Sequence, residues 1–170
     1  MRPDRRSSRF HRRPLLHVAA ALLALAPAVL VGQQKVPLLP QLETRLDGVL
    51  APGPGAMAGL GFNVRAGWYT RLGLALSAGQ VERSGVRRDR QRLDATARFL
   101  FDPFAETKHA FYAGAGLGAE LQGSEAHPLL LGVVGVEGAS VGKVVPSLEL
   151  TLGGGTRLGV VLRGRRTQGR

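Results

Sequence analysis

The chain of 170 residues lacks cysteine and is poor in aromatic residues and lysine. The absence of cysteine excludes a disulfide framework, a thiolate metal site and a lipid-modified N-terminal cysteine. Lysine occurs only at positions 35, 108 and 143, so nearly all of the 23 basic residues are arginine. Arginine suits buried ion pairs better than lysine because its planar guanidinium is less strongly hydrated.

Residues 1–32 have the layout of a secretory signal peptide. The apolar stretch Leu15–Val31, interrupted by Pro27, follows a basic start, and cleavage is predicted after Ala28 or after Gly32. A retained anchor is the alternative, but the stretch is short for a spanning helix, which needs about 20 residues. The basic start contains Arg2, Arg5, Arg6, Arg9, Arg12 and Arg13.

Removal of residues 1–32 leaves 17 basic and 11 acidic residues, a net charge of +6. A basic soluble domain would suggest nucleic acid, but an exported chain is not expected to meet any, so no nucleic-acid partner is predicted. We expect a short N-terminal segment at 33–41, a single β-barrel domain at 42–165 and a basic C-terminal tail at 166–170.

The domain repeats one pattern: apolar residues at every second position, charged residues or glycine between them, and then a turn. A period of two predicts β-strands with one apolar and one polar face. Turn residues separate the segments, and Gln80–Arg92 and Gln122–Pro128 are predicted loops. The eight predicted strands are Leu42–Leu50, Ala58–Trp68, Thr70–Gly79, Arg92–Phe101, Phe111–Leu121, Leu130–Gly138, Val145–Leu152 and Thr156–Arg165.

The polar face indicates which side of a barrel it lines. It is rich in glycine, which weakens a water-facing strand but leaves room inside a narrow barrel. Its acidic and basic residues nearly balance, and buried charges persist only when paired. We therefore predict an eight-stranded antiparallel up-and-down transmembrane barrel whose lumen holds an ion-pair network. The predicted network is Glu43, Arg45, Asp47, Arg65, Arg71, Arg92, Asp94, Arg98, Glu120, Glu137, Glu149, Arg157 and Arg163.

Aromatic residues gather at one end of the predicted barrel. An even number of strands leaves both chain ends at that end, and export would place it in the periplasm. The aromatic residues predict half of the aromatic girdle that is typical of a membrane interface. The residues are Trp68, Tyr69, Phe99, Phe101, Phe104, Phe111 and Tyr112.

The pattern of signal peptide, eight alternating segments and the stretch Tyr112–Gly118 resembles the small eight-stranded outer-membrane barrels, the OmpA-like transmembrane superfamily. The resemblance covers residues 41–165. The chain departs from it in two ways, because such barrels usually end in an aromatic residue and usually have longer outward loops. The resemblance implies a location in the bacterial outer membrane and contacts with its lipids and with the outer-membrane assembly machinery.

Catalytic chemistry has little support in the sequence. His109 and His127 fall at opposite ends of the predicted barrel and cannot share a site. Ser124, Glu125 and His127 supply the residue types of a hydrolase triad, but they belong to one short predicted loop, and a solvated loop is favoured. We predict no catalytic residue, no cofactor and no metal site.

The predicted loop 80–92 carries Arg83, Arg87, Arg88 and Arg90. Guanidinium groups can bind lipopolysaccharide phosphates through paired hydrogen bonds, and a mobile charged loop without a ligand is the alternative. The overall expectation is a monomeric outer-membrane barrel with a structural role in the envelope. A secreted lipocalin-like barrel that binds an apolar ligand in a leucine-lined cup is the alternative, and a lipid A-modifying enzyme is less favoured.

Overall fold

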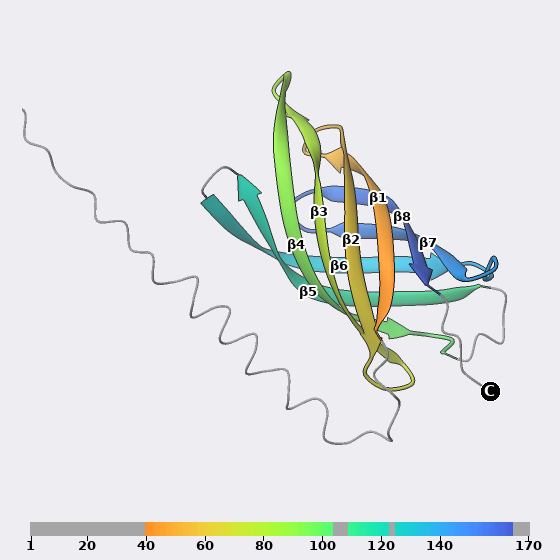
Figure 1. The fold of residues 1–170 in the computed structure, drawn as a ribbon. Helices are drawn as coiled ribbons and strands as arrows, with labels where there is room; N and C mark the ends of the chain where they lie inside the picture. Colours follow the sequence, from red (N-terminus) through yellow and green to blue (C-terminus); the bar gives the residue numbers. More distant parts are fainter. Residues whose placement is uncertain (1–39, 104–108, 123–124, 165–170) are drawn as a thin grey trace, which may run out of the picture. The chain divides into compact units, whose positions relative to one another are not determined.

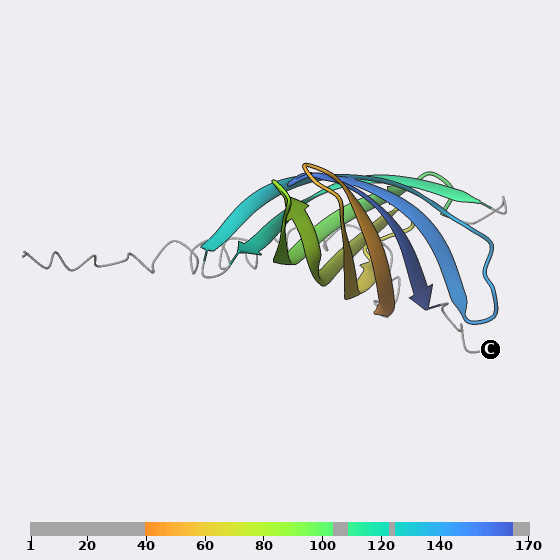
Figure 2. The ribbon, with the colours of Figure 1, turned by 90° about the horizontal axis from the view of Figure 1, so that it is seen from above.

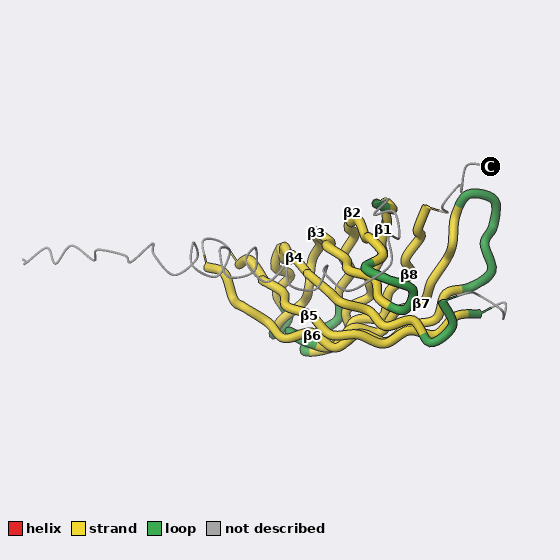
Figure 3. Tube along the Cα trace, turned by 90° about the horizontal axis from the view of Figure 1, so that it is seen from below, coloured by secondary structure: helices red, strands yellow, loops and turns green. Residues whose placement is uncertain are grey.

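The computed structural model describes residues 40–103, 109–122 and 125–164, which form a closed barrel of eight strands (Figures 1 and 2). Figure 3 distinguishes the strands from the described loops that join them. The strands are β1 (Gln41–Ala51), β2 (Gly55–Arg65), β3 (Thr70–Arg83), β4 (Val86–Leu100), β5 (Ala110–Gln122), β6 (Glu125–Glu137), β7 (Val144–Leu152) and β8 (Thr156–Gly164).

Every strand pairs antiparallel with its neighbours in the chain, and β8 closes the barrel by pairing with β1. Glu43 lies opposite Gly61 on one side and Arg163 on the other, so the first and last strands are held in a defined register. The predicted all-β, eight-stranded, up-and-down architecture is confirmed. The predicted signal peptide at 1–32 and the tail at 166–170 lie outside the described residues.

Up-and-down connectivity gives the barrel two distinct ends. We call the end with Gln41 and Gly164 the proximal end; it also carries the links from β2 to β3, β4 to β5 and β6 to β7. The opposite, distal end carries the links from β1 to β2, β3 to β4, β5 to β6 and β7 to β8. These two names are kept below because charge and aromatic residues are distributed differently at the two ends.

The distal hairpins are longer than predicted. Instead of a loop at 80–92, β3 runs to Arg83 and β4 starts at Val86, joined by Ser84 (φ 54°) and Gly85 (φ 77°). Two consecutive residues with positive φ form the tight turn that fits a two-residue β-hairpin. The loop prediction was wrong because consecutive charged residues hide a period of two when both faces are polar.

The sixth strand also starts earlier than predicted, at Glu125 rather than Leu130. Its first half pairs with β5, where Pro128 lies opposite Ala119, whereas pairing with β7 covers only Gly132–Glu137. Proline is tolerated in a strand that is paired on one side, because it has no amide hydrogen to donate to a second neighbour. The prediction of a loop up to Pro128 was therefore wrong.

Burial in this barrel is the reverse of that in a soluble protein. Large apolar side chains point outward, with Leu42, Leu60 and Leu130 among the most exposed. Acidic and basic side chains are buried inside, and a small apolar cluster of Val49, Met57 and Val81 lies toward the distal end. The leucine-lined cup of the lipocalin-like alternative is contradicted, because the leucines of the alternating pattern lie on the outside.

The described part of the chain contains no helical segment with the length and hydrophobicity of a membrane span.

Candidate functional site

The candidate site is the polar interior of the barrel, which we call the lumen network, and Glu149 of β7 joins three of its side chains. One Glu149 carboxylate oxygen accepts a hydrogen bond from Arg45 Nη2 at 3.0 Å. The other accepts one from the Tyr112 hydroxyl at 3.0 Å and lies 3.1 Å from Arg98 Nη2. The Arg98 guanidinium carbon also lies 5.9 Å from the centre of the Tyr112 ring, within cation–π distance. One carboxylate thus connects β7 with β1, β4 and β5.

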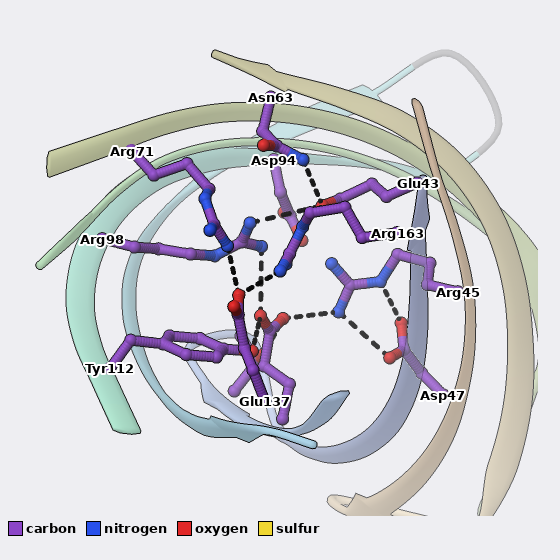
Figure 4. Close-up of polar contacts among 12 residues, drawn as sticks. Glu43, Arg45, Asp47, Asn63, Arg71, Asp94, Arg98, Tyr112, Glu137 and Arg163 are labelled. Atoms are coloured by element: carbon purple, nitrogen blue, oxygen red, sulfur yellow. Dashed lines mark hydrogen bonds and ion pairs between the residues drawn. The ribbon is translucent and has the colours of Figure 1, made fainter. Parts of the chain in front are cut away.

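Glu43 of β1 forms the next junction (Figure 4). Its Oε2 atom accepts hydrogen bonds from Asn63 Nδ2 at 3.1 Å and from Arg98 Nη1 at 3.4 Å. Arg163 Nε lies 3.5 Å from the same oxygen. Arg98 therefore bridges Glu43 and Glu149, two carboxylates on strands that are not neighbours in the barrel.

Glu137, the last residue of β6, extends the network to the proximal end. Its Oε1 atom pairs with both Arg71 of β3 and Arg163 of β8 (Figure 4). The shared carboxylate gives both guanidinium groups a charged hydrogen-bond partner, and a buried arginine without a partner would be costly.

Toward the distal end, Asp47 and Asp94 are likewise carboxylates that are each shared by two arginines. Asp47 accepts two hydrogen bonds from Arg45, at 2.9 and 3.0 Å, and lies 3.5 Å from Arg157 Nη1. Asp94 accepts hydrogen bonds from Arg92 and Arg157, each at 2.7 Å. Arg157 of β8 thus links the carboxylates of β1 and β4.

Arg90 corrects the prediction of an outer lipopolysaccharide contact at that position. Its side chain is buried in the lumen, where it forms an ion pair with Glu120 and donates a hydrogen bond to the Gly154 carbonyl. Beside it, Arg92 Nη2 donates to the Gly153 carbonyl at 2.8 Å. The turn between β7 and β8 therefore supplies backbone acceptors to the lumen.

Two lumen glycines make room for polar neighbours on the adjacent strand. A Cβ atom at Gly135 would lie 2.4 Å from the Tyr112 ring, and one at Gly159 would lie 2.0 Å from Asp47 Oδ1. Each glycine is the register partner of the residue that it accommodates. We predicted that glycine leaves space for side chains from across the lumen, whereas here the space is used by the cross-strand neighbour.

The arginines Arg83, Arg87 and Arg88 remain exposed on the hairpin of β3 and β4. Arg83 and Arg88 line the distal mouth of the lumen together with Pro52, whereas Arg87 borders the outer wall. Of the four arginines predicted to contact lipid phosphates, these three have accessible guanidinium groups.

Five aromatic residues of the predicted girdle are exposed at the proximal end. Tyr69 stacks on Phe99 with ring centres 5.6 Å apart, and Phe99 meets Phe101 edge to face at the same distance. Tyr112 corrects the prediction, because its ring points into the lumen and is 2% exposed. Phe104 lies outside the described residues. The exposed members are Trp68, Tyr69, Phe99, Phe101 and Phe111.

The predicted network omitted several buried polar residues of the lumen, among them Asn63, Arg90 and Tyr112. For Asn63 and Tyr112 the period of two carries the signal, because each has the parity of the charged residue in its own strand. Arg90 has no such signal, because the start of β4 has charged residues at both parities. Arg65, which was predicted for the network, lies at the proximal end of β2 opposite Arg71 and is half-buried.

The residues considered for catalysis do not form a common site in the described part of the chain. His127 lies in β6 opposite Glu120, rather than in a loop, and His109 precedes β5 at the other end of that hairpin. Ser124 is outside the described residues. No group of three or more potential metal-binding side chains occurs among those described.

Comparison with solved structures finds a similar fold in the crystal structure of Neisserial surface protein A, with a TM-score of 0.54 and 14% sequence identity. The match covers 75% of this chain and 96% of that chain. At this identity the similarity shows the fold alone. Models of protein families give no match, and neither do the curated proteins.

Proposed function

We propose that this protein is an outer-membrane β-barrel with a structural role in the bacterial envelope, similar to the OmpA-like small barrels. The observation that carries the proposal is the inverted burial. Leucines cover the outer wall, where water would penalise them, while charged side chains fill the interior. Hydrocarbon around the wall removes that penalty, and closed barrels are the sheets that can span a bilayer because they have no unpaired edge in it.

The proposed orientation follows from the two ends. The exposed aromatic residues of the proximal end suit a membrane interface, and both ends of the described chain lie there, as expected on the periplasmic side. The charged hairpin of β3 and β4 then faces outward from the cell. Export through the signal peptide predicted at 1–32 is part of this proposal.

The lumen network supports a role without transport. Seven arginines and five carboxylates are buried in it. Together with Asn63 of β2 and Glu137 of β6, their side chains connect all eight strands by ion pairs or charged hydrogen bonds. Eight strands leave an interior just wide enough for side chains. In planar bilayers we therefore expect only small-ion leakage, and stable large openings would contradict the filled lumen.

No catalytic role is proposed, because the lumen carboxylates and arginines are engaged with one another. The proposed partners are membrane lipids, together with the outer-membrane assembly machinery during biogenesis, and the proposed oligomeric state is the monomer. A lipid A-modifying activity would appear as altered lipid A in cells that carry the gene, and we expect none.

Fractionation tests the membrane location. The protein should require detergent for extraction from the outer membrane and should migrate faster on gels when it is not heated, because the folded barrel resists the detergent. A periplasmic protein made in the same cells serves as the control for release by osmotic shock. Recovery of this protein in the shock fluid would rule out the proposal.

A further inference from the structure

The outer wall carries a hollow of about 710 Å³ at the distal ends of β1, β2 and β3. Its floor is made of the exposed small residues Ala56, Ala58 and Ala78. Ala58 lies opposite Ala78 on one side and Leu46 on the other. One row nearer the proximal end, the same positions hold leucine, with Leu60 opposite Leu76. The hollow is therefore a gap in the leucine belt.

The distal rim of the hollow is polar. Gln80 and Glu82 of β3 and Arg87 of β4 line it, and Glu82 lies opposite Arg87 in the register. Gln80 is engaged, since its amide donates to Asp89 at 3.0 Å. An apolar floor that ends at a charged rim is the surface expected where acyl chains meet head groups.

The guanidinium groups at the tip of this hairpin are available to an anion. Within the part of the chain that the structure describes, Arg83, Arg87 and Arg88 form no ion pair, in contrast to the arginines of the lumen. These three outnumber the nearby carboxylates of Glu82 and Asp89, which would oppose an anion. The tip therefore keeps a net positive charge.

We propose that this hollow binds an acyl chain of lipid A, with a lipid phosphate held by Arg87. The inference rests on the proposed membrane location and outward orientation, and it names the lipid partner of that barrel. Guanidinium groups bind phosphate through paired, charge-assisted hydrogen bonds. Lipid A is favoured over a glycerophospholipid because it has more than one phosphate: Arg87 borders the hollow, and Arg83 and Arg88 on the same hairpin lie exposed at the lumen mouth beside it. A second copy of the chain is disfavoured, because a symmetric contact would bring the same arginines together.

Native mass spectrometry of protein extracted from outer membranes in mild detergent tests the proposal by counting bound lipid A. The variant Ala58→Leu/Ala78→Leu fills the floor. The matched control is Ala97→Leu/Ala115→Leu, an exposed pair of cross-strand neighbours on β4 and β5. Arg87→Gln removes the rim cation, and Lys143→Gln removes an exposed cation at the proximal end.

We expect the wild type and both controls to retain lipid A, and Arg87→Gln to lower its occupancy by about tenfold, as for loss of a charge-assisted hydrogen bond. The floor variant should lose it at least as strongly. The inference would be overturned if the floor variant retained lipid A as the wild type does, or if its control lost lipid A as strongly. Bound glycerophospholipid or a second copy of the chain in place of lipid A would also overturn it. Faster migration of unheated samples confirms folding of each variant, and wild-type fractionation tests the membrane location separately.

Discussion

The lumen and the outer wall are built by the same eight strands, yet their side chains face opposite requirements. Neighbouring residues of β7 illustrate this, because Leu148 is 48% exposed while Glu149 is 1% exposed. Inside, each charge needs partners, since an unpaired buried charge is costly. Outside, a side chain needs only to be apolar. The interior should therefore depend on particular pairings, whereas the wall should tolerate exchanges among apolar residues.

Among the substitutions that test this contrast between lumen and wall, loss of Glu149 should destabilise the barrel most. Glu149→Ala removes the carboxylate shared by Arg45, Arg98 and Tyr112, and we expect it to lower the free energy of unfolding by about 3–5 kcal/mol. Urea unfolding in lipid vesicles, followed by Trp68 fluorescence, measures the effect. A loss below about 1 kcal/mol, the range of exposed pairs, would show that the network is not a structural unit.

A charge on the wall should be almost as harmful, for the opposite reason. Leu148→Arg places an arginine near the middle of β7 on the outer face and should cost about 2–4 kcal/mol if that face meets hydrocarbon. Leu148→Val should have little effect in the same unfolding measurement. If the arginine variant were as stable as the valine variant, the wall would not be lipid-facing.

Glycine substitutions test the same contrast between lumen and wall, with smaller expected changes in stability. Gly135→Ala drives a methyl group into the Tyr112 ring and should destabilise the barrel by about 1–3 kcal/mol through overpacking. Gly48→Ala is the matched control, because an added Cβ there meets only the Leu158 carbonyl oxygen, at 3.7 Å. Equal stability of the two variants would mean that Tyr112 can leave its position without cost.

Alternation was sufficient to predict the barrel because its two environments differ so sharply. Most strands near their middle show mainly apolar residues on one face and mainly glycine, charged or polar residues on the other, as in β1 from Leu42 to Leu50. The exception is β6, which has Leu131 and Val133 inside and Leu130 and Val134 outside. The same rule would have placed Tyr112 inside, since it alternates with Phe111 and Ala113. The girdle prediction included Tyr112 because it falls near the same end of the barrel as the other aromatic residues.

The distal hairpins could not be predicted in this way, because both of their faces meet polar surroundings. At Arg87, Arg88 and Arg90, charge alone does not distinguish a side chain that points into the lumen from one that points outward. Only the folded structure settles that Arg90 pairs with Glu120 of β5 while Arg87 borders the outer wall. The hollow at Ala58 and Ala78 likewise depends on register, which brings together residues that are 20 positions apart.

The first residues of β6 form an edge that is paired on one side only. Between Glu125 and Leu129 this strand has β5 on one side and no ladder with β7 on the other. Such an edge can recruit a foreign strand, which is a route to aggregation. Pro128 lies in the middle of this stretch and lacks the amide hydrogen that an incoming strand would use. At the outward-facing end of the proposed barrel, a strand from a neighbouring molecule would therefore find no continuous row of donors to pair with.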